Sequence, residues 1–353
     1  MISRRVFLYK LYIVLNISII WVIFSIVFLY NIIGVEKEIL AERRLSFFSL
    51  AFALIGFIVV GAEAFFLKNA FHKIPFWLSI ILRMTLTFFL FVIVSILFLL
   101  AYFVFRYNGY FSDFTSVFLN QIVRTPSFLM FMVDLGLLSF ISIILLEIND
   151  KYGPGGFFRM IRGRYNNPRL ENRIFIFLDI NDSTTIAERL GHEKYFGMLK
   201  DFFADITEPI LTNAGEIYQY VGDEVVVSWK NTPKNKTRCL KFIKQAFLTL
   251  KRKEKKYIDK YGVALTFKTG IHAGEVTAGY IGIIKKDLAY SGDTLNTTAR
   301  IRSKCHELHH SFILSGEFLQ NFDQHKSYRI EAIGEIELKG REEKEKLYSV
   351  NFE

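Results

Sequence analysis

Cysteine is scarce in this chain of 353 residues, which contains only Cys239 and Cys305. A disulfide framework needs more cysteines, and both of these lie in the C-terminal half, so we expect reduced thiols. Zinc-ligand spacings, internal repeats and low-complexity tracts are also missing from the sequence. Apolar heptads are missing between residues 148 and 171, which argues against a coiled-coil rod there.

A net charge of +10 raises nucleic acid as a partner. The densest basic run, from Lys251 to Lys260, is interleaved with Glu254 and Asp259 on one expected helix. No aromatic stacking motif accompanies it. We therefore expect a solvated helix face and no nucleic acid partner, with attraction to anionic lipid as the second interpretation.

Hydrophobic residues make up 52% of the chain and charged residues 22%, a mixture that indicates two chemically different halves. The apolar excess falls into four runs, residues 11–33, 47–67, 76–105 and 128–146. About 20 residues of helix cross a hydrocarbon core of roughly 30 Å. The sequence therefore predicts an all-α membrane domain with four transmembrane helices over residues 1–147, a linker at 148–171, and a second domain at 172–353.

Basic residues predict the orientation in the membrane. They precede the first span (Arg4, Arg5, Lys10) and follow the fourth (Lys151, Arg159, Arg162, Arg164, Arg169). An even number of spans puts both ends on one side, and positive charge favours the cytoplasmic side. We expect a multi-pass protein of the inner (plasma) membrane, with its N-terminus and second domain in the cytoplasm.

Two acidic residues, Glu63 and Asp134, lie inside the predicted spans. Ionisable groups there are costly and are often functional, so each needs a partner or a role. Arg83 is a candidate partner, as is a second subunit.

The second domain alternates between strand and helix patterns. Residues 173–180 read as a buried strand, and 218–229 as a hairpin whose turn contains Gly-Asp. The remaining expected elements are helices at 182–190, 192–211, 236–261 and 294–304, two strands at 266–274 and 275–283, a strand near Phe312, and a hairpin of 329–338 with 345–352. This order predicts an α+β ferredoxin-like (βαββαβ) sandwich with C-terminal additions.

Two carboxylates stand where this fold brings elements together. Asp179 ends the first strand and Asp223 lies in the hairpin turn; alone, either residue is most simply a cap or turn residue. Two carboxylates on one sheet edge repel each other, so a divalent cation is their natural partner. Magnesium prefers carboxylate and phosphate oxygens, which indicates a nucleoside triphosphate. The helix that begins in residues 181–185 offers backbone amides to phosphate.

Three further polar residues are candidates for the same chemistry. Asn296 and Arg300 are four apart and project from one helix face, where an arginine fork suits phosphate. Lys339 precedes a glycine turn at a strand end. Read singly, these are most simply surface residues.

Taken in order, FLDI with ST, GDE, GDTLNTTAR and ELKG resemble a class III nucleotidyl cyclase catalytic domain over about residues 172–351. The resemblance implies that Asp179, Asp223 and the Ile180 carbonyl bind two divalent ions, Mg²⁺ or Mn²⁺. It implies that Ser183 and Thr184 hold the triphosphate and that Lys339 contacts its terminal phosphates. Asn296 and Arg300 would orient the ribose and stabilise the transition state. In this family they act from the opposite subunit, which implies a homodimer.

The chain departs from the family at two positions that contact the base. Adenylate cyclases tend to carry Lys and then Asp or Thr there, and guanylate cyclases Glu and then Cys; this chain has Gln219 and Ala289, with Asp287 as a candidate substitute. We expect an adenylate cyclase that converts ATP to 3′,5′-cyclic AMP and pyrophosphate. A guanylate or pyrimidine nucleotide cyclase, a catalytically silent cyclase-like receptor, a diguanylate cyclase and a regulated transporter are the alternatives.

Overall fold

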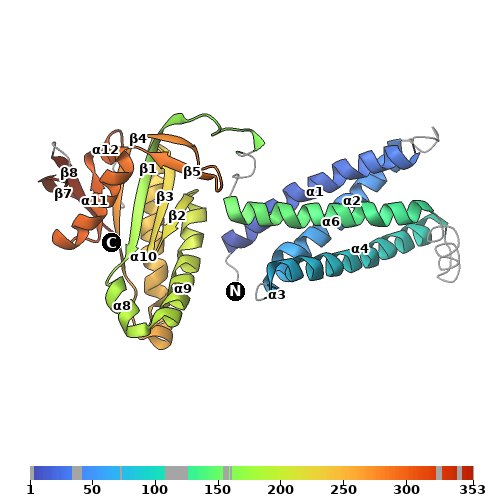
Figure 1. Ribbon diagram of the computed structural model, residues 1–353, viewed down its shortest axis with the longest axis horizontal. Helices are drawn as coiled ribbons and strands as arrows, with labels where there is room; N and C mark the ends of the chain where they lie inside the picture. Colours follow the sequence, from blue (N-terminus) through green and yellow to red (C-terminus); the bar gives the residue numbers. More distant parts are fainter. Residues whose placement is uncertain are drawn as a thin grey trace. The chain divides into compact units, whose positions relative to one another are not determined.

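The chain forms two compact units, Met1–Tyr152 and Gly153–Glu353, in a computed structural model (Figure 1). The structure describes residues 4–33, 42–71, 74–107, 126–153, 159, 161–322, 328–339 and 344–352. Part of the expected linker, residues 154–158 and 160, lies outside these described residues.

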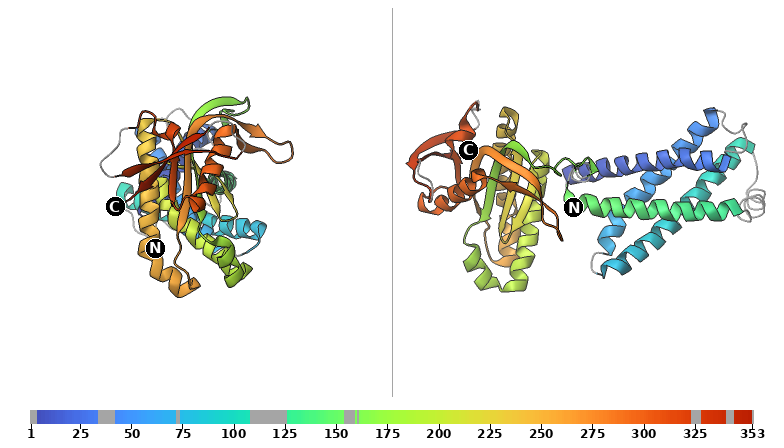
Figure 2. Two further views of the ribbon diagram at one scale, coloured as in Figure 1. Left: turned by 90° about the vertical axis from the view of Figure 1, so that its left-hand side faces the viewer. Right: turned by 45° about the horizontal axis from the view of Figure 1, so that its top comes forward.

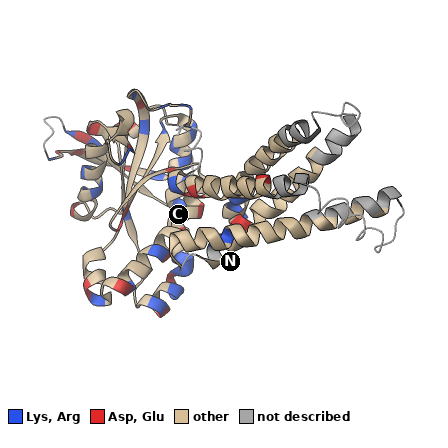
Figure 3. Cartoon of the chain, turned by 45° about the vertical axis from the view of Figure 1, so that its right-hand side comes forward, with Lys and Arg blue, Asp and Glu red and all other residues tan. Residues whose placement is uncertain are grey.

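The first unit consists of long apolar helices. They are α1 (Arg4–Ile33), α2 (Glu42–Ala62), α4 (Phe76–Tyr107) and α6 (Pro126–Tyr152), and α2 continues through a π-helical turn, η1 (Glu63–Leu67), into the short α3 (Lys68–Ala70). Charged side chains are sparse along these helices and frequent in the second unit (Figure 3). Three segments of the described residues are long and apolar enough to cross a membrane: Arg4–Ile26, Ser49–Leu67 and Phe76–Val94. The predicted fourth span falls on α6, which is not one of these three, and it stays a prediction.

A buried ion network joins η1, α4 and α6. Arg83 Nε donates a 2.5 Å hydrogen bond to Glu63 Oε1, and its Nη1 donates a 2.7 Å hydrogen bond to Glu147 Oε1. Glu63 is 1% exposed and Arg83 is 2% exposed, so each charge is compensated by the other within the unit. Arg83 is therefore confirmed as the partner of Glu63. Asp134 is partly buried on α6.

The second unit has the predicted ferredoxin-like core. Its elements are β1 (Arg169–Ile180), α8 (Ser183–Leu190), α9 (His192–Thr212), β2 (Glu216–Val221), β3 (Glu224–Lys230), α10 (Pro233–Tyr261) and β4 (Phe267–Ile281). The strands lie in the order β2-β3-β1-β4, which confirms the predicted fold class. The C-terminal additions are β5 (Asp287–Ser291), α11 (Asp293–Glu307), β6 (Phe312–Ser315), α12 (Gly316–Leu319), β7 (Arg329–Ile336) and β8 (Glu345–Asn351), and they extend the sheet through β6-β8-β7 while β5 pairs with β4.

Helices cover both faces of the sheet (Figure 2). Side chains along β1 alternate between two hydrophobic cores, one on each face. Ile174, Ile176 and Leu178 belong to the core that contains α9 and α10. Phe175 and Phe177 belong to the other core, against which Leu295 and Ala299 of α11 pack. The site residues of β1 therefore emerge at the end of a strand that is fixed on both sides.

The expectation of two strands at 266–274 and 275–283 is wrong, because β4 is one continuous strand. It pairs antiparallel with the whole of β1, from Arg169 opposite Ala278 to Ile180 opposite Phe267. Gly270 interrupts the side-chain pattern but does not mark a turn. A Cβ at Gly270 would overlap the backbone of Arg302, so this glycine allows α11 to lie directly on the strand.

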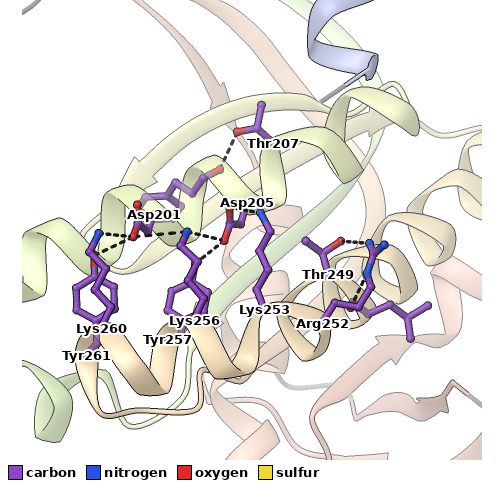
Figure 4. Close-up of polar contacts among 12 residues, drawn as sticks. Asp201, Asp205, Thr207, Thr249, Arg252, Lys253, Lys256, Tyr257, Lys260 and Tyr261 are labelled. Carbon is purple, nitrogen blue, oxygen red and sulfur yellow. Dashed lines mark hydrogen bonds and ion pairs between the residues drawn. The ribbon is translucent and has the colours of Figure 1, made fainter. Parts of the chain in front are cut away.

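The basic run on α10 contacts α9 through a ladder of ion pairs (Figure 4). Lys253 lies 2.6 Å from Asp205 Oδ1 and Lys260 lies 2.8 Å from Asp201 Oδ2. The hydroxyls of Tyr257 and Tyr261 donate to the same two carboxylates at 2.9 Å each. These lysines remain about half exposed, as expected for a solvated helix face. Their ion pairs also hold α10 against α9.

Candidate active site

The structure brings Asp179 and Asp223 together at one edge of the sheet. Asp179 pairs with Glu224 in the β1–β3 register, so the β2–β3 turn that contains Asp223 lies beside the end of β1. The two carboxyl groups lie close enough for each to shift the pKa of the other, and the Ser183 side chain is close enough to lower the pKa of Asp223. Asp179 is 7% exposed, which makes an uncompensated charge there costly.

The pKa values of the two carboxyl groups are shifted in opposite directions. Burial, followed by the hydrogen bond to Asp223 and the charge of that carboxylate, raises the pKa of Asp179. Burial opposes ionisation of Asp223 as well, but its hydrogen bonds with Asp179 and Ser183 hold the pKa of that carboxyl below its usual value. The edge thus presents two closely spaced groups of hard oxygen ligands. A divalent cation fits the same place, because it would compensate both charges at once.

Ser183 and Thr184 open α8 immediately after this edge. Asp182 precedes them with a left-handed φ of 53°, which turns the chain sharply from β1 into the helix. The Ser183 side chain is partly buried near Tyr195 of α9, whereas Thr184 is exposed. Ile180 is buried as the last residue of β1.

Gln219 and Ala289 come from strands that contact each other through neighbouring residues. Gln219 is exposed opposite Val226, and Ala289 is partly buried opposite Gly279. The Tyr218 hydroxyl accepts a 3.4 Å hydrogen bond from the backbone N–H of Tyr290, and the two rings are 5.0 Å apart. One region thus contains both positions.

Asn296, Arg300 and Lys339 are not joined to the carboxyl pair. In the described part of the chain, no hydrogen bond or ion pair links their side chains to Asp179 or Asp223. Asn296 is exposed and Arg300 is half-buried on α11, and Lys339 is exposed after β7. Arg300 Nη1 is buried and lacks a hydrogen-bond partner among the described residues, so it is a donor available to an anion.

Sequence reasoning missed three charged residues that surround Asp179. Arg302 Nη1 donates a 3.1 Å hydrogen bond to Asp179 Oδ2, and Lys268 Nζ lies 3.3 Å from the same oxygen. Arg302 Nη2 lies 2.9 Å from Glu224 Oε2. Glu224 was visible in the GDE turn, and the signal for Lys268 was its place on the strand that neighbours Asp179. Arg302 had no such signal, because it is two residues from Arg300 and so on another side of the helix.

Comparison with known proteins identifies the second unit. The family described as the adenylate and guanylate cyclase catalytic domain matches residues 166–351. "Adenylate cyclase 2" of Rhizobium meliloti (strain 1021) is 31% identical over 203 residues, which are 57% of this chain and 56% of that protein. "Receptor-type guanylate cyclase gcy-10" of Caenorhabditis elegans is 26% identical over 180 residues, 49% of this chain and 16% of that protein. The chain thus spans about half the length of the first relative and less of the second.

A solved structure of a bacterial light-regulated adenylyl cyclase is similar in fold. It superposes with a TM-score of 0.54 at 21% identity and covers 63% of this chain and 65% of that one. The resemblance seen in the sequence motifs and the predicted cyclase-domain fold are both confirmed.

Proposed function

Because the chain belongs to the adenylate and guanylate cyclase catalytic domain family, we propose that it is a membrane-anchored nucleotidyl cyclase. It converts ATP to 3′,5′-cyclic AMP and pyrophosphate. The observation that carries this proposal is that Asp179 and Asp223 lie side by side on the edge of a cyclase-type sheet. The name of the Rhizobium relative supports ATP as the substrate.

Asp179, Asp223 and the carbonyl of Ile180 would hold two Mg²⁺ or Mn²⁺ ions. Such ions would supply a lowered pKa for the ribose 3′-hydroxyl and would offset charge on the phosphates. The 3′-oxygen forms a bond to the α-phosphorus, the bond from that phosphorus to the bridging oxygen breaks, and pyrophosphate leaves. The hydroxyl proton passes to solvent.

The remaining residues bind and orient the nucleotide. Ser183 and Thr184 contact the triphosphate at the start of α8. Asn296 orients the ribose, Arg300 donates to the reacting phosphate through its unsatisfied nitrogen, and Lys339 contacts the terminal phosphates. Gln219 and Ala289 line the base site, and Gln219 offers both a donor and an acceptor.

We infer that the protein acts as a homodimer. Within one chain, Asn296 and Arg300 are not bonded to the carboxyl pair in the described residues, so a complete site takes them from a second subunit. The apolar helices and flanking basic residues support a multi-pass protein of the inner membrane, with the cyclase unit and N-terminus in the cytoplasm.

The full chain, in membranes or detergent, tests the proposed reaction. Purified protein receives Mn²⁺ with ATP, GTP, UTP or CTP, and mass spectrometry identifies any cyclic product. We expect cyclic AMP from the unaltered chain and at least a hundredfold less from Asp223→Asn, because one metal carboxylate is lost. Cyclic GMP or a cyclic pyrimidine nucleotide would reassign the substrate, and no product from any nucleotide would favour a silent receptor.

A further inference from the structure

Arg302 is a single guanidinium that bridges two buried carboxylates. Its Nη1 lies 3.1 Å from Asp179 Oδ2 and its Nη2 lies 2.9 Å from Glu224 Oε2. Asp179 is 7% exposed and Glu224 is 8% exposed, so both carboxylates are largely shielded from solvent, and the Arg302 side chain between them is partly buried. An arginine that contacts two buried carboxylates with different nitrogens restrains both side chains, since its planar fork cannot follow independent motions of the two.

The bridge acts on one oxygen of Asp179. The shortest contacts of Arg302 and of Lys268 are both with Oδ2, at 3.1 Å and 3.3 Å. Two cations on Oδ2 hold the carboxylate in one rotamer and leave Oδ1 as the oxygen available to another ligand. Asp223, the second carboxyl of the edge, lies in the turn beside this same group, because its neighbour Glu224 pairs with Asp179.

The position of Arg302 is fixed by the backbone of α11. A Cβ at Gly270 of β4 would overlap the Arg302 backbone nitrogen and the Thr298 carbonyl oxygen, so helix and strand lie in direct contact there. A Cβ at Gly274 would meet Thr294 Oγ1 at 2.6 Å, which shows the same close approach one helical turn earlier. The guanidinium therefore extends from a rigid support and not from a loop.

We propose that Arg302 is a positioning residue, which orients Asp179 for a divalent cation while Glu224 orients Arg302. The inference rests on the proposed function, because it assigns Asp179 to a metal. A residue that orients a metal ligand typically changes metal affinity by 10–100-fold when it is removed. A merely structural ion pair would change the stability of the unit and leave metal affinity as it is.

Mn²⁺ binding to the full chain, measured by electron paramagnetic resonance without nucleotide turnover, tests this role. We expect Arg302→Gln to weaken Mn²⁺ binding by about tenfold. Arg302→Lys keeps the charge but reaches one carboxylate at a time, so it should recover part of the loss. Glu224→Gln should weaken binding by less than Arg302→Gln. Lys304→Gln removes an exposed ion pair with Glu307 on the same helix and should leave binding unchanged.

Thermal unfolding of each variant, followed by circular dichroism, shows whether it is folded. Unchanged or tighter Mn²⁺ binding in folded Arg302→Gln, or in Arg302→Lys where the Gln variant does not fold, overturns the positioning role. Asp223→Asn separates this result from failure of the proposed function. If Asp223→Asn binds Mn²⁺ as the unaltered chain does, the edge is not a metal site and both proposals fail. If only Asp223→Asn loses binding, the metal edge stands and the role of Arg302 falls.

Discussion

We expect Gln219 and Ala289 to determine which nucleotide base the site selects. Guanine presents two hydrogen-bond donors, its N1–H and its amino group. A Glu carboxylate has two oxygens that can accept from both, whereas the Gln amide has one accepting oxygen and an NH₂ group that only donates. We predict that Gln219→Glu combined with Ala289→Cys raises the ratio of kcat/KM for GTP to that for ATP by at least about tenfold, equivalent to ~1.4 kcal/mol. Steady-state kinetics with both nucleotides measure the ratio.

Asp287→Asn is the matched control for this change. Asp287 lies two residues before Ala289 on β5, and its side chain is 60% exposed and 2.8 Å from Lys285. Because Lys285 already engages that carboxylate, we expect the GTP to ATP ratio to stay the same. An unchanged ratio in the Glu-Cys variant would remove both positions from base selection, and a changed ratio in Asp287→Asn would add a third.

The meeting of Asp179 and Asp223 was predictable because each lies at the end of a strand whose neighbour the fold determines. The contact of Arg302 with both carboxylates was not. It depends on how closely α11 approaches β4, and Gly270 sets that distance. A sequence pattern gives the spacing of side chains along one helix, but it does not give the depth at which the helix packs.

At the scale of elements, Arg83 of α4 is the charge that joins η1 and α6. Its removal leaves Glu63, which is 1% exposed, without its compensating cation. We predict that Arg83→Gln destabilises the helical unit by about 3 kcal/mol, because it leaves the buried Glu63 carboxylate without a compensating charge. Thermal unfolding of the full chain in detergent measures the loss.

The double variant that combines Glu63→Gln with Arg83→Gln tests the reason for that loss of stability. With both charges removed, we expect stability to recover by more than half of the deficit. Lys151→Gln, at an exposed cation near the end of α6, should change little. If the double variant is as unstable as Arg83→Gln, packing of the arginine and not its charge holds the helices.

Helices and strands were predictable where the residues that mark them lie close together in the sequence. The ends of α9 and of the final hairpin fall within a few residues of expectation, since apolar periodicity and turn residues mark them. The continuous β4 was missed because its length is set by pairing with all of β1, a partner about 100 positions away in the chain. The predicted break fell after Gly274, a position that this pairing carries straight through.

At the scale of the whole molecule, each chain carries two halves of a site that the described contacts do not join. The carboxyl pair lies at the end of β1, and Asn296 and Arg300 lie on α11. If two subunits share each site, Asp223→Asn and Arg300→Gln damage different halves. A mixed dimer of the two variants then contains one intact site and one site with both defects.

We predict that co-expressed full-length Asp223→Asn and Arg300→Gln chains regain about a quarter of the unaltered activity, because half of randomly formed dimers are mixed and each has one working site. Each variant alone should produce almost no cyclic nucleotide. Two tags purified in sequence isolate the mixed dimers, in which activity should approach one half. If mixed dimers are as inactive as their parents, Asp223 and Arg300 act within the same site of one chain, and the site is not shared between subunits.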